Sequence, residues 1–320
     1  SQDYFPYGPI THEHMRASLV RFEELLESSE SADAFRQALV DEFEVWMARG
    51  RDNSGEVLFT GYCTPIFPGS LERTERFRHP LYTLPPDLVK GDGGAILGRR
   101  TADDAIVPYY TRGELRRNHH LDGTELVWLE NAFDVYTAHV QGSAIIDLTS
   151  GERMEVGYAG KNGHEYQSIG LKLVEEGKLG KDELSLTRLQ QYFRDHPGEE
   201  GPALDVNPSF VFFRRTGGGP FGSLGQKVTA ERSLATDKSV FPRAGIVYAE
   251  VRLPDFNPAG KLVQRPFRFF ALDQDTGGAI RSAGRCDVYL GTGDQAVSRA
   301  GHVFSVGRMY YLFLRTDLAR

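Results

Sequence analysis

Two aspartates near the end of the sequence have the residue type and setting that acid–base chemistry requires. Asp275 opens an Asp-Thr-Gly run, and Asp287 precedes a run that contains Gly291 and Gly293. Two carboxyl groups that come close together have pKa values that move apart, so one can stay protonated at neutral pH and act as an acid. Aspartate is also common at turns, where it caps backbone N–H groups. Position alone leaves both interpretations open.

Three short stretches resemble known functional motifs but lack the sequence context that those motifs require. Asp275-Thr276-Gly277 looks like half of an aspartic protease site, but no second copy of that loop exists, since Asp287 is followed by Val-Tyr. The stretch GTGDQA (291–296) fits a dinucleotide fingerprint, yet too few residues follow it for the second half of a nucleotide-binding sheet. The stretch GGGPFG (217–222) contains a proline and precedes a predicted strand, so we interpret it as a flexible link.

Composition narrows the classes of function and of partner that remain. The 320 residues carry a net charge of −7 without a long basic run, which argues against nucleic acid as a partner. No stretch approaches the ~20 apolar residues of a membrane span, and the first residues do not resemble a signal peptide. Two cysteines are too few for a four-cysteine zinc site, and the nine histidines lack zinc-binding spacing. We expect no metal and no cofactor.

The elements that must position these residues are mostly short strands. Helical spacing predicts one helix from about residue 12 and a second over 31–47, capped by Ser31. Two further short helices are expected over 166–179 and 185–197, the second ended by Pro197. Apolar stretches separated by Gly, Pro, Asn and Asp elsewhere predict strands. This pattern favours a mainly β protein built on a barrel or sandwich over a doubly wound sheet.

A series of specific segments resembles the membrane-bound lytic transglycosylase A (MltA) family. The segments follow the family's order, most closely between residues 55 and 314: YFPYGPI, FTGYCTP, HPLY, HVQGSAII, YAGKNGHEYQSIG, NPSFVFF, RSLATD, QDTGGAI and CDVYLGTG. The resemblance implies a double-psi β-barrel domain with an inserted second β-rich domain, a groove between them and a few N-terminal helices. We expect domain A over 1–64 and 222–320, and domain B over 65–221.

The resemblance also implies an activity, that of a peptidoglycan lytic transglycosylase. Such enzymes cleave the β-1,4 bond between N-acetylmuramic acid and N-acetylglucosamine, and the muramyl 6-hydroxyl attacks its own anomeric carbon to leave a 1,6-anhydro end. The family's acid/base matches Asp287, with Asp275 and Asp237 as supporting acids of the C-terminal three-aspartate domain. A tethered nucleophile makes a second catalytic carboxylate unnecessary. The alternative is a non-catalytic carbohydrate-binding barrel of the expansin-like type.

The family resemblance places further residues along the glycan strand. On one wall we expect Thr60, Gly61 and Tyr62, with Gly291 and Gly293 allowing close approach of the polymer; on the other wall we expect Gln141, Ser143, Tyr158, Asn162, Tyr166 and Ser168. Strand pairing is an equally supported interpretation of Gln141 and Ser143, and Asn162-Gly163 is first of all a turn signal.

The sequence departs from the family in two places. The loop RSAGR (281–285) is one residue longer than usual, and Cys63 stands where a second tyrosine or another large residue is expected. Alternation along the strands points Cys63 and Cys286 inward, either as two separate buried thiols or as a disulfide.

The family also implies where the protein works and what it contacts. The resemblance implies a periplasmic, outer-membrane-associated protein held by an N-terminal lipid anchor that precedes this sequence. Its expected partners are peptidoglycan glycan strands, and other cell-wall enzymes are candidate partners.

Overall fold

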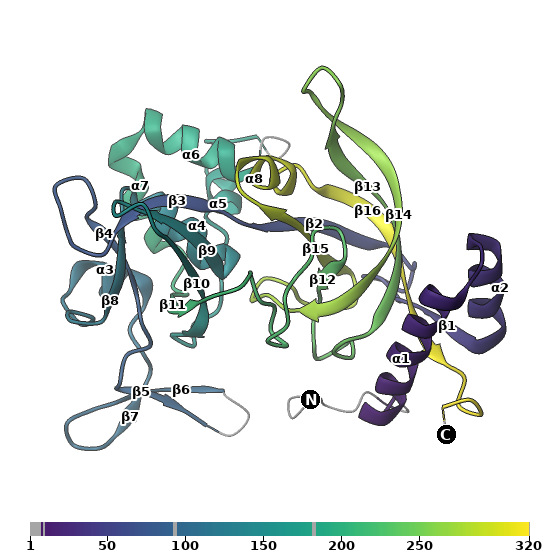
Figure 1. The fold of residues 1–320 in the computed structure, drawn as a ribbon. Helices are drawn as coiled ribbons and strands as arrows, with labels where there is room; N and C mark the ends of the chain where they lie inside the picture. The colour runs from purple at the N-terminus through teal and green to yellow at the C-terminus, as the bar shows by residue number, and fades with distance from the viewer. Residues whose placement is uncertain (1–7, 9, 92–94, 181–183, 320) are drawn as a thin grey trace. The chain divides into compact units, whose positions relative to one another are not determined.

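The chain packs into two compact units. The computed structural model describes residue 8 and residues 10–91, 95–180 and 184–319 (Figure 1). The first unit comprises Ser1–Tyr62, Phe221–Gly291 and His302–Arg320, and the second comprises Cys63–Pro220 and Thr292–Gly301. These packing units assign 292–301 to the second unit. The division into domains at residues 64/65 and 221/222 stays a prediction.

The first unit is built on a closed six-stranded barrel. In barrel order its strands are β16 (Phe304–Leu314), β13 (Ile246–Phe256), β14 (Leu262–Asp275), β12 (Ser233–Ala235), β15 (Arg285–Thr292) and β2 (Val57–Thr64). Pairing of β16 with β2 closes the barrel, with Phe304 opposite Thr60. β12 and β14 are parallel, whereas β13 pairs with β14 in a long antiparallel hairpin whose tip extends beyond the other strands (Figure 1).

Alternation along the strands fills the barrel interior. On β2, Val57 and Phe59 are completely buried, and on β15 so are Cys286 and Val288. Side chains one position away, such as Thr60 and Asp287, therefore point to the outer face of the barrel. Thr60 and Asp287 thus lie on the same side of neighbouring strands.

The N-terminal helices pack on this barrel. α1 (His12–Ser28) begins where the sequence predicts it, and α2 (Ala32–Glu42) begins after Ser31, whose hydroxyl accepts a hydrogen bond from the Ala34 N–H at 3.1 Å. The predicted extension of the second helix to residue 47 is wrong. β1 (Phe43–Met47) instead pairs antiparallel with β16, with Phe43 opposite Leu314 and Trp46 opposite Tyr311. Strand pairing and burial of Phe43 override the helical pattern.

The second unit contains two sheets. The larger has the order β11 (Val211–Thr216), β10 (Arg153–Lys161), β9 (Ser143–Leu148), β3 (Ile66–Ser70), β8 (Glu125–Leu129) and β4 (His79–Tyr82). The smaller contains β5 (Leu88–Lys90), β6 (Ile96–Arg100) and β7 (Ile106–Val107). The helices of this unit are α3 (Arg112–Arg117), α4 (Ala132–Gln141), α5 (Ile169–Glu175), α6 (Leu186–Asp195), α7 (Pro197–Asp205) and α8 (Asp294–Ala300).

Local signals in the second unit are partly confirmed. The predicted turn around residues 149–151 joins β9 to β10, and Gly151 adopts the left-handed φ of +88° that glycine tolerates. α5 and α6 match the two predicted short helices. Pro197 follows the end of α6, as expected, but it also opens α7 as the first helical residue, a position that proline favours because its missing N–H is not needed there.

Mainly β structure, the predicted fold class, is confirmed by the barrel and by the β-rich second unit. No helix among the described residues combines the length and the apolar composition needed to cross a membrane.

Candidate functional site

Asp287 lies on the outer face of the barrel, in the middle of β15. Its neighbours in the sheet are β12, where Ala235 is opposite Asp287, and β2. The side chain is 16% exposed, and its Oδ1 accepts hydrogen bonds from the Thr60 hydroxyl and, at 3.4 Å, from Nε of Arg285. Burial raises the pKa of Asp287, while the charge of Arg285 and the Thr60 bond act in the opposite direction. A carboxyl group with a raised pKa suits an acid at neutral pH.

Asp275 caps the turn at the end of β14. Its Oδ1 accepts hydrogen bonds from the backbone N–H groups of Ser223 and Thr276, both at 2.8 Å. Burial raises the pKa of this carboxyl group, and the two backbone bonds lower it. The turn-capping interpretation of Asp275 therefore matches the contacts of its side chain.

Asp237 fastens the loop between β14 and β15. Oδ1 accepts from the Ser239 N–H at 3.0 Å and the Ser239 hydroxyl at 2.7 Å, and Oδ2 accepts from the Ser282 N–H at 2.7 Å. Burial acts to raise the pKa of Asp237, but these hydrogen bonds outweigh it and hold the pKa below its ordinary value. Among the hydrogen bonds of the described residues, none joins two of the three aspartates. Each aspartate thus has its own partners.

A tyrosine pair lies near these carboxyl groups. The rings of Tyr62 and Tyr289 are 5.1 Å apart and tilted by 53°. Burial, followed by the charge of Asp275, raises the pKa of Tyr62 well above its ordinary value, so the phenol stays neutral. The buried Tyr62 hydroxyl has no hydrogen-bond partner of ordinary geometry among the described residues. Interaction of this phenol with the Asp275 carboxyl group contributes to the pKa shifts of both groups.

Glycines shape the end of β15. Gly291 and Gly293 adopt φ of +101° and +83°, which residues with a side chain rarely adopt. Gly293 precedes α8, and its N–H donates to the Thr64 carbonyl at 3.0 Å. Gly61 is partly exposed on β2. The positive φ values account for glycine at 291 and 293 without reference to a ligand.

Four predicted contacts in the second unit already have internal partners. The Gln141 side-chain oxygen accepts from the Cys63 N–H at 2.9 Å, and the Ser143 and Thr64 hydroxyls are 3.2 Å apart. Ser168 caps α5 by accepting from the Leu171 N–H at 3.2 Å. The fourth, Asn162, is 2% exposed.

The Asn162 amide is fully occupied by backbone groups. Its NH₂ donates to the carbonyls of Tyr110 and Pro208, both at 2.8 Å, and its oxygen accepts from the N–H of Phe210 at 2.9 Å and of His164 at 3.4 Å. An amide offers two donors and two acceptor sites. The contacts therefore assign Asn162 to holding the second unit together.

The two tyrosines predicted for this wall differ in exposure. Tyr158, on β10, is 50% exposed. The Tyr166 hydroxyl lies 3.4 Å from the hydroxyl of Tyr136, a buried residue of α4. Tyr158 is therefore the more accessible ring.

Sequence reasoning missed Arg285, although its position two residues before Asp287 on a strand puts both side chains on one face. It also missed a buried ionic cluster around Asp273, which is completely buried. Asp273 pairs with Lys238 and accepts from the hydroxyls of Thr236 and Tyr311, both at 2.7 Å. These bonds tie β14 to β16 and to the segment after β12.

The cysteines are two buried free thiols, each completely inaccessible. Burial raises the pKa of Cys63 to about 12 and that of Cys286 well above its ordinary value. Among the described residues, no group of three or more His, Cys, Asp or Glu is arranged to hold a metal.

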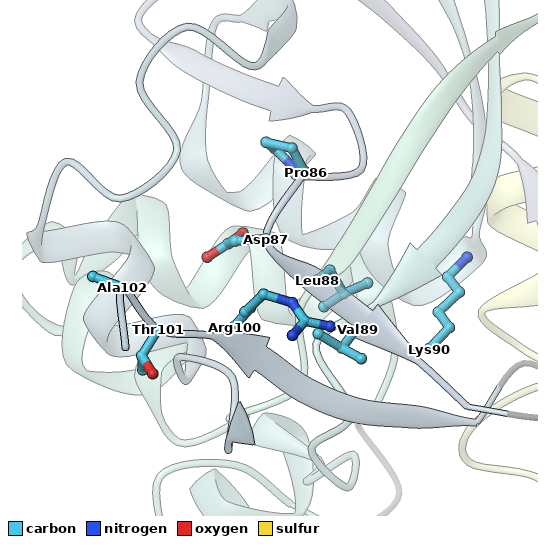
Figure 2. A pocket seen from close by; sticks show the side chains of 8 residues that line it. All are labelled: Pro86, Asp87, Leu88, Val89, Lys90, Arg100, Thr101 and Ala102. Carbon is cyan, nitrogen blue, oxygen red and sulfur yellow. The ribbon is translucent and has the colours of Figure 1, made fainter. Parts of the chain in front are cut away.

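An open pocket of about 630 Å³ lies beside the small sheet of the second unit (Figure 2). Its lining comes from β5, β6 and adjoining residues: Pro86, Asp87, Leu88, Val89, Lys90, Arg100, Thr101 and Ala102. Asp87 accepts a hydrogen bond from the Tyr109 hydroxyl at 3.0 Å. None of the predicted site residues lines this pocket.

Comparison with known proteins gives consistent matches along the chain. Residues 58–214 match the family model described as the MltA specific insert domain, and residues 232–313 match the 3D domain. The chain is 32% identical over 272 residues to membrane-bound lytic murein transglycosylase A of Escherichia coli K12, covering 84% of this chain and 69% of the relative. It is 31% identical over 277 residues to the Vibrio cholerae protein of the same name, covering 84% and 68%.

Solved structures of proteins with similar names also resemble this chain. The membrane-bound lytic murein transglycosylase from Agrobacterium tumefaciens matches with a TM-score of 0.80 and 27% identity, covering 95% of this chain and 86% of that one. The E. coli MltA structure with bound chitohexaose matches with a TM-score of 0.76 and 28% identity, covering 94% and 83%. The resemblance seen in the sequence is confirmed, and the chain belongs to the membrane-bound lytic murein transglycosylase A family.

Proposed function

We propose that this protein is a peptidoglycan lytic transglycosylase in which Asp287 is the single acid/base. The observation that carries the proposal is the setting of Asp287, whose carboxyl group has a raised pKa and is partly accessible on the barrel surface. Asp275 and Asp237 are engaged with backbone N–H groups instead. Ordinary glycosidases need two carboxylates flanking the bond, and this site offers one that is not committed to backbone groups.

The reaction balances with one carboxyl group. Asp287 donates its proton to the glycosidic oxygen as the bond from that oxygen to the muramyl anomeric carbon breaks. The muramyl 6-hydroxyl oxygen then bonds to the same carbon and returns its proton to Asp287. No water is consumed, and the product carries a 1,6-anhydro ring. Because the nucleophile is tethered to the reacting sugar, its effective concentration replaces the activation of water by a second carboxylate.

The neighbouring groups have supporting roles in this proposal. Asp275 and Asp237 fix the turn and the loop that lead from β14 into β15, so that Asp287 stays in place. Tyr62, which is partly exposed, is a glycan contact on the barrel, and the glycines at 61, 291 and 293 leave room for the polymer. Tyr158 and Tyr166 are the glycan contacts of the second unit. The remaining predicted contacts act indirectly: Gln141, Asn162 and Ser168 bond backbone groups, and Ser143 contacts the Thr64 hydroxyl.

The proposed substrate agrees with what the relatives are named for. The E. coli relative is a murein transglycosylase and has been solved with bound chitohexaose, a β-1,4-linked oligosaccharide. We place this protein at the periplasmic cell wall, held at the outer membrane by a lipid upstream of this sequence, with glycan strands as its partner and other cell-wall enzymes as candidate partners.

Digestion of purified peptidoglycan tests the proposal. The wild-type protein should release muropeptides that end in 1,6-anhydromuramic acid, detectable by mass spectrometry. Asp287→Asn should lower the rate at least a hundredfold, within the range for loss of acid–base catalysis, and should still retain glycan strands in a pull-down. A wild-type protein that retains glycan but releases nothing would instead be a carbohydrate-binding barrel.

A further inference from the structure

Arg285 contacts Asp287 along the strand that carries both. The two residues are separated by Cys286, which is completely buried in the barrel, so their side chains share the outer face of β15. Neighbours two positions apart on a strand are roughly 7 Å apart at their Cα atoms. The long Arg285 side chain bridges this gap, and its Nε lies 3.4 Å from Oδ1 of Asp287.

The Arg285 guanidinium is held from three directions. Besides the contact with Asp287, Nη1 donates to the Ala279 carbonyl at 3.1 Å, and Nη2 donates to the Thr60 hydroxyl at 3.3 Å. The first of these comes from the loop between β14 and β15, and the second from β2. Because the Ala279 carbonyl carries no net charge, it holds the guanidinium in both protonation states of Asp287. A lysine ammonium could not reproduce this planar fork.

Both donors converge on one oxygen of the carboxyl group. The Thr60 hydroxyl accepts from Arg285 and donates its own proton to Oδ1, the same atom that Nε of Arg285 faces. Among the described residues, Oδ2 of Asp287 accepts no hydrogen bond. A proton on Oδ1 would compete with two donors, whereas a proton on Oδ2 would not.

We infer that Arg285 is a positioning residue for Asp287: together with Thr60 it fixes Oδ1 as an acceptor, so that Oδ2 is the oxygen that gives and takes the catalytic proton. This inference rests on the proposed role of Asp287 and adds which atom reacts and what orients it. Arg285 belongs to the segment RSAGR (281–285), which leads from the loop after β14 into β15.

Charge gives the inference a measurable signature. Arg285 is the positively charged group in contact with Asp287, and its charge is the largest effect that opposes the burial-induced rise in the Asp287 pKa. Two other groups are close enough to Asp287 for its charge to affect their pKa values, and both are uncharged at neutral pH: the Tyr62 phenol on β2 and the Cys286 thiol, which points into the barrel. On the β12 side, Ala235 is opposite both Asp287 and Asp275, so the Asp275 carboxyl group lies one strand beyond, with its Oδ1 occupied by the N–H groups of Ser223 and Thr276. The carboxylate of Asp237, after β12, is occupied by Ser239 and Ser282.

Two substitutions separate charge from position. Arg285→Gln removes the charge, so the Asp287 pKa should rise and the basic limb of kcat/KM against pH should move upward by about one unit, the lower end of what a nearby charge produces. Its kcat should fall at least about tenfold because the carboxyl group loses its orientation. Arg285→Lys keeps the charge, so the limb should stay in place while kcat still falls. Arg252→Gln, an exposed arginine of β13, is the matched control and should change neither.

The measurements are initial rates of soluble anhydromuropeptide release between pH 4 and 9, with circular dichroism melting curves for every variant. An unchanged limb and unchanged kcat in Arg285→Gln would overturn the inference. If Arg285→Gln does not fold, Arg285→Lys decides the question. A wild-type kcat in Arg285→Lys would show that the planar guanidinium is not needed to position Asp287, and would overturn the inference. Asp287→Asn measured alongside separates the two claims: an active Asp287→Asn contradicts the proposed function, whereas an inactive one with a normal Arg285→Gln contradicts the Arg285 inference alone.

Discussion

The hydroxyl of Thr60 donates a hydrogen bond to Oδ1 of Asp287, joining residues that lie 227 positions apart in the sequence. The bond forms because β2 and β15 are neighbours in the barrel and both side chains point to its outer face. The family resemblance predicts that Thr60 contacts the glycan. In the structure its hydroxyl contacts the proposed acid, which gives Thr60 a role in holding that acid.

Thr60→Val should therefore impair catalysis. Valine keeps the branched shape but loses the hydroxyl, so Asp287 loses one of its two donors and Arg285 loses an acceptor. We expect kcat to fall about tenfold and the basic limb of kcat/KM to move to higher pH, because the Thr60 bond lowers the Asp287 pKa. Thr60→Ser keeps the hydroxyl and should stay close to wild type. A Thr60→Val enzyme with a raised KM alone would assign Thr60 to the glycan.

Asp237→Asn tests the fastening of the loop before β15. The asparagine NH₂ cannot accept the hydrogen bonds that a carboxylate oxygen takes from Ser239 or Ser282, so we expect a loss of about 1–3 kcal/mol in the free energy of unfolding at pH 7. The measurement is urea denaturation followed by circular dichroism, with Asp33→Asn, an exposed residue of α2, as the surface control.

The pH dependence of the same variant has a defined sign. The pKa of Asp237 is lower in the folded state than in the unfolded chain, where it is about 3.9. Its stabilising contribution is therefore complete above that pH and is lost as the pH falls through the folded-state value. The stability difference between wild type and Asp237→Asn should shrink in that acidic range. A difference that is equally large at pH 7 and at pH 2 would contradict the ionic role.

Asn162→Ala should destabilise the protein strongly. It removes the partner of two carbonyl groups and two N–H groups in a buried position, and each unsatisfied buried group costs about 1–3 kcal/mol. We expect a loss of at least about 3 kcal/mol in the urea unfolding transition of the second unit. Asn118→Ala, at the exposed end of α3, serves as the comparison. Unchanged stability with weakened glycan retention would return Asn162 to the substrate-binding residues.

The two cysteines should behave as inert thiols. Both are completely buried with raised pKa values, so the reactive thiolate is scarce and inaccessible. A colorimetric thiol reagent at pH 8 should label the native protein only slowly and should count two thiols per chain after denaturation without reductant. Fewer than two would mean that they pair under the conditions of preparation.

Local signals explain what the sequence could predict. α1, the cap at Ser31 and the β9–β10 turn depend on residues close together in the chain, so pattern and turn chemistry suffice. Helical spacing continues through Phe43–Met47, so the local pattern predicts a helix there. The strand that forms instead pairs with β16, at the opposite end of the chain, and a local pattern does not encode that pairing.

The residues of the site likewise fall into those that a local sequence motif identifies and those that only the folded structure brings together. Asp287 follows from the resemblance of its segment to a known family, since such a motif is local in sequence. Its partners Thr60 and Arg285 follow only from barrel closure and from the path of the loop that presents the Ala279 carbonyl. The occupation of Asn162 by four backbone groups likewise depends on segments that meet only in the folded unit. Sequence patterns do not encode such distant contacts.

The central claim is that one carboxyl group acts with a nucleophile belonging to the substrate, and digestion of peptidoglycan in ¹⁸O-labelled water tests it most directly. Mass spectrometry of the released muropeptides should show 1,6-anhydro ends without ¹⁸O, because no water enters the reaction, and Asp287→Asn should release none. Reducing ends that carry ¹⁸O as the main product would show ordinary hydrolysis and would contradict the account.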